Sequence, residues 1–233
     1  MWEGTSLASD RRIKPILKPL VESDASLYYF KSHLIITPVR HILINIKFGS
    51  GYQRIKCFLS FEPLCHYHPN RVQYCHYFYK LPLGWITDHP GDQDRYLAKL
   101  QHDAIPEMKK IVTLDQCVEL WDRLHPMDST MQLRAIGHAM QGDFGEASRN
   151  LVPAYNNVFN EWHSGVGQKL ADEGENFSKA DRRVLLALMH RREAENARQL
   201  KLEEKYWEPS LFPAEITYPE LRVLRPDGTV MDD

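Results

Sequence analysis

Hydrophobic and polar residues alternate with a period of two along residues 41–62. The apolar positions on one face are Ile42, Ile44, Ile46 and Phe48 in the first run, and Ile55, Cys57, Leu59 and Phe61 in the second. This alternation is typical of half-buried antiparallel strands, and the intervening Gly-Ser-Gly predicts a hairpin loop. We therefore predict that Ile44, Ile46, Cys57 and Leu59 are buried on a shared apolar face.

Further strands are predicted on both sides of this hairpin. The segments LYYF and HLIIT precede it, and Pro38 restricts the second of them to a sheet edge or a strand end. The segment VQYCHYFYKL follows it. Residues 25 to 83 are thus expected to form a meandering sheet of about four or five strands.

Beyond residue 85 the pattern changes to helical spacing. A helix interrupted at Pro106 is followed by one that Thr113 can cap, and then by two helices around Gly142-Asp143. The last long helix starts at Ser178 and is mostly charged or small from His190 to Gln199. That portion is expected to be solvated or to cover another surface.

These patterns predict an α+β fold, with an antiparallel sheet followed by an all-helical half. The predicted divisions are a sheet domain with a short N-terminal helix (1–85), a helical domain (86–207) and an extended tail (208–233). The tail contains a Pro-Asp-Gly turn between two short β-like runs.

Composition and charge narrow the function classes. The chain has 233 residues, of which 43% are hydrophobic and 26% charged, and a net charge of −2. This balance offers no general attraction for nucleic acid or anionic lipid. No segment resembles a transmembrane helix or a signal peptide, and four cysteines do not suggest a disulfide framework. A cytoplasmic protein with no membrane partner is expected.

The segment CHYHPNRVQYCHYFYK, residues 65–80, is the main candidate for metal chemistry. His66, His68 and Cys75 are its candidate ligands, but the spacing contains neither CxxC nor HxxxH. A strand would also turn Cys75 and His76 to opposite faces. We favour the interpretation that this segment is an ordinary aromatic strand and not a metal site, so no metal and no cofactor are expected.

Motifs for other chemistry are missing. The sequence lacks GxSxG, GxxxxGK[ST], GxGxxG and HExxH. His190 and Glu193 lie one helical turn apart, and the favoured interpretation is a solvated ion pair on a helix surface. No catalytic residue is predicted, and an enzyme is not the favoured interpretation.

Two segments resemble known families. The sequence AIGHAMQGDFGEASRNL, residues 135–151, resembles a tetratricopeptide helical hairpin, with small residues on both sides of a Gly-Asp turn. Because only one such unit is visible, it implies a single hairpin of a kind that binds partners. Residues 20–85 are similar to a bacterial domain of unknown function, through PVRHIL and a later strand ending in Pro63-Leu64. Small domains of this kind often occur among bacterial immunity proteins.

The favoured function is binding of another protein. Its most concrete form is a bacterial immunity protein or antitoxin that neutralises its cognate toxin by occlusion. The predicted partner-binding residues are Arg191, Arg192, Tyr206 and Trp207. The two arginines should act mainly on association, whereas the two aromatics are candidate anchors because a few such side chains carry most interface energy. The alternative for the aromatics is that both dock onto the helical core. The alternative is a metal-dependent hydrolase centred on residues 65–76. A third hypothesis is binding of single-stranded nucleic acid to an aromatic sheet face, although the net charge makes nucleic acid an unfavoured partner.

Overall fold

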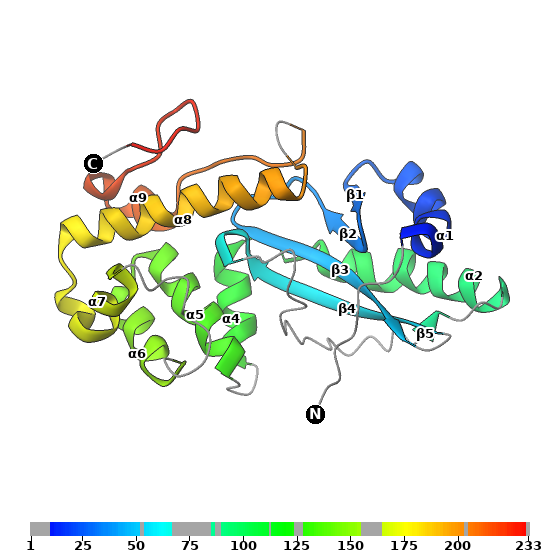
Figure 1. Cartoon of the computed structure of the whole chain (residues 1–233), viewed down its shortest axis with the longest axis horizontal. Coiled ribbons are helices and arrows are strands. Elements are labelled where there is room, and N and C mark those ends of the chain that lie inside the picture. Colours follow the sequence, from blue (N-terminus) through cyan, green and yellow to red (C-terminus); the bar gives the residue numbers. More distant parts are fainter. Residues whose placement is uncertain are drawn as a thin grey trace.

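In the computed structural model, one five-stranded sheet lies beside a set of helices (Figure 1). The structure is described for residues 10–51, 54–66, 85–86, 90–111, 113–123, 128–154, 165–202 and 205–231. The strands are β1 (Leu27–Phe30), β2 (His33–Ile36), β3 (Ile42–Gly51), β4 (Arg54–Pro63) and β5 (Trp85–Ile86). They form an antiparallel meander in chain order. The predicted α+β fold is confirmed.

Helices and short turns make up the rest of the described chain. The α-helices are α1 (Asp10–Ser23), α2 (Pro90–Lys99), α3 (Ile105–Met108), α4 (Leu114–Arg123), α5 (Asp128–Gln141), α6 (Phe144–Ala154), α7 (Val166–Glu173), α8 (Lys179–Gln199) and α9 (Pro213–Thr217). The tighter or wider turns are η1 (Leu64–His66), η2 (Leu100–Ala104), η4 (Gly174–Asn176) and η5 (Pro219–Leu221).

The predicted hairpin is formed by β3 and β4, but the prediction that Gly-Ser-Gly is its loop is wrong. These three residues belong to β3, where Ser50 pairs with Ile55 and Gly51 with Arg54. Ile44 lies opposite Phe61 and Ile46 lies opposite Leu59, so the apolar positions of both strands share one face. Ile44, Ile46 and Leu59 are buried as predicted, whereas Cys57 is half-buried. Helix α1 and the α2–α3 region supply the apolar side chains that pack against this face.

The prediction that these strands are only half-buried is wrong. Leu43 and Asn45, on the opposite face of β3, are fully buried, and Glu62 of β4 is buried as well. The end of α8 covers part of this second face, where Ala197 and Leu200 join a hydrophobic cluster with Leu43. Burying both faces requires a partner for each polar side chain among them.

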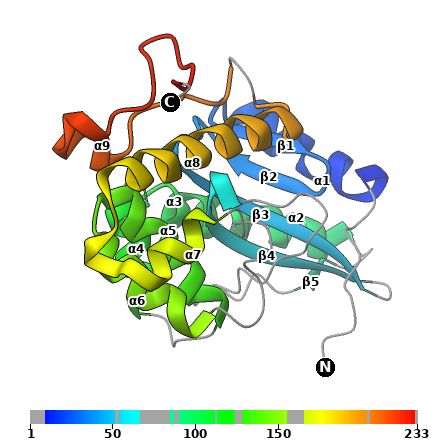
Figure 2. The same ribbon diagram turned by 60° about the vertical axis from the view of Figure 1, so that its left-hand side comes forward.

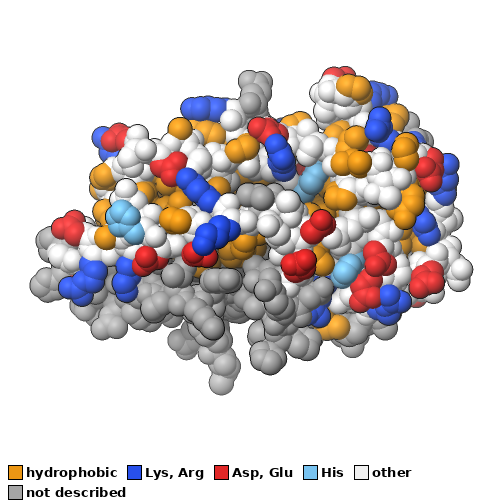
Figure 3. Space-filling model, turned by 180° about the vertical axis from the view of Figure 1, so that it is seen from behind, with side chains coloured by type: hydrophobic (Ala, Val, Ile, Leu, Met, Phe, Trp, Pro, Cys, Tyr) orange, Lys and Arg blue, Asp and Glu red, His pale blue; other side chains and the backbone are white. Residues whose placement is uncertain are grey.

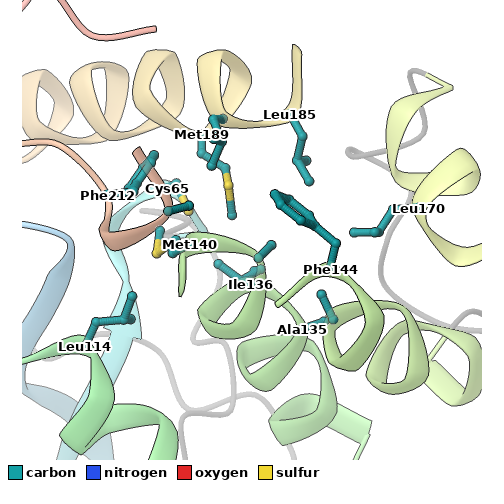
Figure 4. Packing of buried hydrophobic residues seen from close by; sticks show 14 of the residues in the cluster. Cys65, Leu114, Ala135, Ile136, Met140, Phe144, Leu170, Leu185, Met189 and Phe212 are labelled. Atoms are coloured by element: carbon teal, nitrogen blue, oxygen red, sulfur yellow. The ribbon is translucent and has the colours of Figure 1, made fainter. Parts of the chain in front are cut away.

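The helical half is organised as the periodicity predicts. Thr113 and Gln116 exchange hydrogen bonds in a capping box at the start of α4, and Ser178 caps α8 by accepting from the Asp181 amide. Gly142, at φ 90°, provides the left-handed turn of the predicted hairpin between α5 and α6. Figure 4 shows the core between this hairpin and α8, with Met140 facing Met189.

The interruption predicted at Pro106 is a change of helical pitch. The π-helical segment η2 separates α2 from α3, directly before this proline. A proline lacks the amide hydrogen that a regular helix needs, and a wider turn accommodates that loss. The chain keeps its direction, and Leu100, Ala104 and Ile105 remain in the core beneath the sheet.

The segment after residue 207, predicted as an extended tail, folds back as a short helix and a hairpin. Figure 2 shows α9 and the C-terminal segment beside α8. Phe212 and Val223 are fully buried in the main helical core. The predicted Pro-Asp-Gly turn is present, because Leu224 pairs with Val230 in an antiparallel bridge.

Within the described residues, no helix combines the length and the apolar character needed to span a bilayer.

Candidate functional site

Four buried ionisable side chains from distant parts of the chain meet at the junction of the sheet, α8 and the C-terminal segment. We call His41, His190, Glu193 and Glu215 the carboxylate–histidine network. His41 Nδ1 lies 3.1 Å from Glu193 Oε1, and His190 Nε2 lies 2.7 Å from Glu215 Oε2. His190 Nδ1 lies 3.7 Å from Glu193 Oε2, which links the two pairs. All four residues are at most 9% exposed.

Helix geometry explains why α8 supplies two members of this network. His190, Glu193, Asn196 and Ala197 are spaced by three or four residues, so they lie on one face of the helix. That face is turned to the sheet, and the Asn196 side chain donates to the carbonyl of Leu64 at 2.7 Å. The prediction that His190 and Glu193 form a solvated pair is therefore wrong.

Glu215 fixes the C-terminal segment to this junction. Its Oε2 accepts a hydrogen bond from the amide of Phe212 at 2.9 Å. Its Oε1 accepts from the amides of Val223 at 2.8 Å and Leu224 at 3.2 Å. Phe212 stacks on the ring of His190, with centroids 3.9 Å apart. One carboxylate thus organises both the start of α9 and the chain that follows η5.

The electrostatics favour the charged forms of His190, Glu193 and Glu215. Burial alone would lower the pKa of His190, but the carboxylates of Glu193 and Glu215 outweigh burial and raise that pKa to about 9. Burial likewise opposes ionisation of Glu193, yet the positive charge at His41 and the contact with His190 keep its pKa below the usual value. Interacting charges inside a protein compensate one another only with good geometry and hydrogen bonds.

Ser210, His41 and Glu193 are connected in the order of a serine-hydrolase triad. Ser210 Oγ lies 3.2 Å from His41 Nε2, while His41 Nδ1 faces the Glu193 carboxylate. However, His41 Nε2 also lies 3.1 Å from the carbonyl oxygen of Leu211. A carbonyl can only accept, so this contact requires a hydrogen on Nε2. The lone pair that would take the proton of Ser210 is then occupied, and the geometry does not favour a general base.

A second group of buried polar side chains lies on one face of the sheet. We call it the sheet-face cluster, and its members are His33, Asn45, Lys47, Ser60 and Glu62. All are at most 5% exposed. Lys47 Nζ lies 2.7 Å from Glu62 Oε1, and the Ser60 hydroxyl donates to the same oxygen at 3.1 Å. The residue pairs His33–Lys47 and Asn45–Ser60 lie directly opposite each other in the sheet.

The charges in the sheet-face cluster are balanced within it. Burial, followed by the positive charge of Lys47, lowers the pKa of His33 to about 3, so this imidazole is neutral at pH 7. Burial alone would raise the pKa of Glu62, but Lys47 outweighs it and lowers that pKa. Among its five members, the ion pair of Lys47 and Glu62 and the neutral imidazole of His33 add up to no net charge.

The predicted partner-binding residues are divided between the surface and the protein interior. Arg191 is exposed, and Arg192 is half-buried and pairs with Glu195 at 3.3 Å. Tyr206 stacks on Tyr28 with centroids 4.4 Å apart, and Val39 pairs with the backbone around Trp207. Both aromatic side chains are half-buried and pack against the cluster that covers the second sheet face.

Of the predicted metal candidates, only His66 lies within the described residues, where it is half-buried at the end of η1. His68 and Cys75 lie outside them. Within the described chain, no three His, Cys, Asp or Glu side chains form a group that could hold a metal ion. Burial raises the pKa of Cys65 well above its usual value and that of Cys117 to about 12, which disfavours thiolate chemistry.

Both buried clusters were missed by sequence reasoning because polar residues within a charged helix or on an alternating strand normally face solvent. The three-and-four spacing of His190, Glu193 and Asn196 was the available signal on α8. No comparable signal marked Glu215 in the predicted tail.

Comparisons with known proteins leave the geometry as the only guide to function. The chain matches no protein-family model, no curated protein and no solved structure.

Proposed function

We propose that this chain is a protein-binding module, and in its narrower form an immunity protein or antitoxin that neutralises a toxin by occlusion. The observation that carries the proposal is the way in which α9 presents two exposed apolar side chains. Ile216 is 64% exposed and Tyr218 is 43% exposed, although the residue beside them, Glu215, is fully buried. Exposed apolar side chains that lie close together on one anchored element are typical of protein-binding surfaces.

The anchoring of α9 supports this interpretation. Glu215 connects the segment to His190 and to three backbone amides. Tyr218 also lies over Gly142, where an added Cβ would meet its ring at 3.0 Å. A surface that is already ordered loses little conformational entropy when a partner binds, which favours affinity.

The charged surroundings suit a protein partner better than nucleic acid. Figure 3 shows basic and acidic side chains interspersed over one face of the molecule, with hydrophobic side chains between them. Nucleic-acid binding depends on concentrated positive charge. Tyr28, one of the aromatics that suggested a base-stacking sheet, is already stacked on Tyr206. Arg191 and Arg192 remain proposed contributors to the charged rim of a protein interface, where they would act mainly on association rates.

The proposal is tested with a tagged chain in the cells of its native source. We expect a partner to be recovered in a fixed ratio from wild type, and recovery to fall at least about tenfold for Ile216→Asp/Tyr218→Ser, since hot-spot side chains carry at least about 1.4 kcal/mol. Glu220→Ser, at an exposed site near α9, is the matched control and should retain the partner. Circular dichroism and melting must show that all three proteins are folded alike.

The immunity form requires a second result. The recovered partner should arrest growth when expressed alone, and co-expression of wild type should restore growth while Ile216→Asp/Tyr218→Ser does not. Protein binding through α9 is contradicted if the double variant recovers the partner as well as wild type does. Binding without any toxicity of the partner contradicts the immunity form alone.

A further inference from the structure

Asn45 is an unusual polar residue among those that the structure describes. It is fully buried in the sheet, yet within the described part of the chain neither its side-chain oxygen nor its side-chain nitrogen has a hydrogen-bond partner. An unpaired buried polar group costs about 1–3 kcal/mol. An Asn at a sheet position that would suit Leu or Val equally well is therefore costly, unless something else pairs with the amide.

The described residues around Asn45 do not supply that partner. Ile35, directly opposite on β2, is apolar and fully buried. Ser60, directly opposite on β4, gives its hydroxyl hydrogen to Glu62. Lys47 lies two residues along β3 on the same face, and its ammonium group contacts the same carboxylate. Asn45 thus lies beneath an ion pair that crosses the face from β3 to β4.

We propose that the sheet-face cluster holds a small neutral molecule that donates and accepts hydrogen bonds, and that this molecule bridges the Asn45 amide to the Lys47–Glu62 pair. A carboxamide carries both donors and acceptors, so its partner must offer both kinds of group. Water is the simplest molecule with this chemistry, and a small organic amide or alcohol is the other source. Buried water typically makes about three hydrogen bonds to such otherwise unpaired groups.

The charge balance of the cluster explains why the occupant is neutral. Lys47 and Glu62 already compensate each other at 2.7 Å, and His33 carries no charge at pH 7. A charged ligand would add an uncompensated charge to a site in which every side chain is at most 5% exposed. The desolvation cost of that charge would far exceed what a single amide can return.

Whether Asn45→Leu raises or lowers Tm tests this proposal. Leu has nearly the shape of Asn, so Asn45→Leu removes the hydrogen-bonding groups with little change in volume. With an occupant present, the substitution breaks a bridge and should lower Tm by several degrees. With no occupant, it relieves an unpaired amide, and a higher Tm would overturn the proposal. The control is Asn196→Leu, which removes a known bond to Leu64 and should lower Tm in either case.

A measurement on the wild-type protein keeps the test independent of whether Asn45→Leu folds. We expect a direct, long-lived NOE between the Asn45 side-chain amide hydrogens and water. If the occupant is organic, mass spectrometry of the denatured protein should instead recover one equivalent of a small neutral compound. Absence of both signals would contradict the proposal.

Discussion

The carboxylate–histidine network and the sheet-face cluster are similarly buried, but they hold histidines in opposite charge states. His190, between two carboxylates, has a pKa raised to about 9. His33, beside Lys47, has a pKa lowered to about 3. Burial acts in the same direction on both rings, because it always disfavours the charged form. Carboxylate partners therefore reverse the effect of burial at His190, whereas at His33 burial dominates and Lys47 adds to it.

The two clusters also differ in what they connect. The sheet-face cluster joins neighbouring strands that backbone pairing already holds together. The carboxylate–histidine network joins His41, α8 and the C-terminal segment. His41 and Glu193 are 152 residues apart in sequence, and His190 and Glu215 are 25 residues apart. Loss of the sheet-face cluster should weaken strands that backbone pairing still holds together. Loss of the carboxylate–histidine network should separate the C-terminal segment from α8 and the sheet.

The largest effect is expected from Glu215→Ala. It leaves the His190 imidazolium without its closest carboxylate and leaves three backbone amides without an acceptor, so we expect a loss on the order of 5 kcal/mol in the free energy of unfolding. Urea denaturation provides the measurement. The matched control is Glu220→Ala at an exposed position, which should change stability by less than about 0.5 kcal/mol. Equal effects of the two substitutions would contradict the structural role of Glu215 in the carboxylate–histidine network.

A smaller effect is expected from Lys47→Met. It leaves Glu62 buried without its ammonium partner and should cost about 3 kcal/mol. The double substitution Lys47→Met/Glu62→Leu should restore most of that stability, because it removes both charges and the strands remain paired. No such recovery is expected for His190→Leu/Glu215→Leu, since the amides bound by Glu215 stay unpaired. A double-mutant cycle on each pair measures whether the second substitution restores the free energy of unfolding.

The pH dependence should separate the clusters by sign. The pKa of His190 is raised, so its contribution is complete below about pH 6.5 and is lost as the pH rises through about 9. The pKa of His33 is lowered, so its contribution is complete above about pH 6.5 and is lost as the pH falls toward about 3. At about 1.4 kcal/mol per pKa unit, these shifts correspond to roughly 3 kcal/mol for His190 and roughly 5 kcal/mol for His33. Unfolding free energies measured across this range should therefore lose their alkaline slope in His190→Gln and part of their acid slope in His33→Gln.

The smallest effect on stability is expected on the outer surface of α8. Arg191→Glu/Arg192→Glu alters an exposed residue and one half-buried ion pair, so the free energy of unfolding should change by less than about 1 kcal/mol. Partner association should nevertheless become slower and change its salt dependence, which stopped-flow mixing would show. A loss of stability comparable to that of Glu215→Ala would mean that these arginines belong to the buried structure.

The sequence predicts the parts of this fold that depend on local pattern. The β3–β4 face, the caps at Thr113 and Ser178, and the turn at Gly142 follow from residue spacing and turn chemistry. The burial of Asn45 and Glu62 does not follow, because alternation identifies two faces but not whether the polar face is also covered. The site at Glu215 depends on contacts between segments far apart in the chain, which local periodicity cannot report.

Hydrogen exchange at the amides of Val223 and Leu224 tests most directly the claim that the network holds the C-terminal segment to the body of the protein. Both amides donate to Glu215. The account predicts that they exchange with nearly the same free energy of opening as the β3 amides of Ile44 and Ile46, and that Glu215→Ala abolishes this protection. Exchange of Val223 and Leu224 that is orders of magnitude faster than that of β3 in the wild-type protein would contradict it.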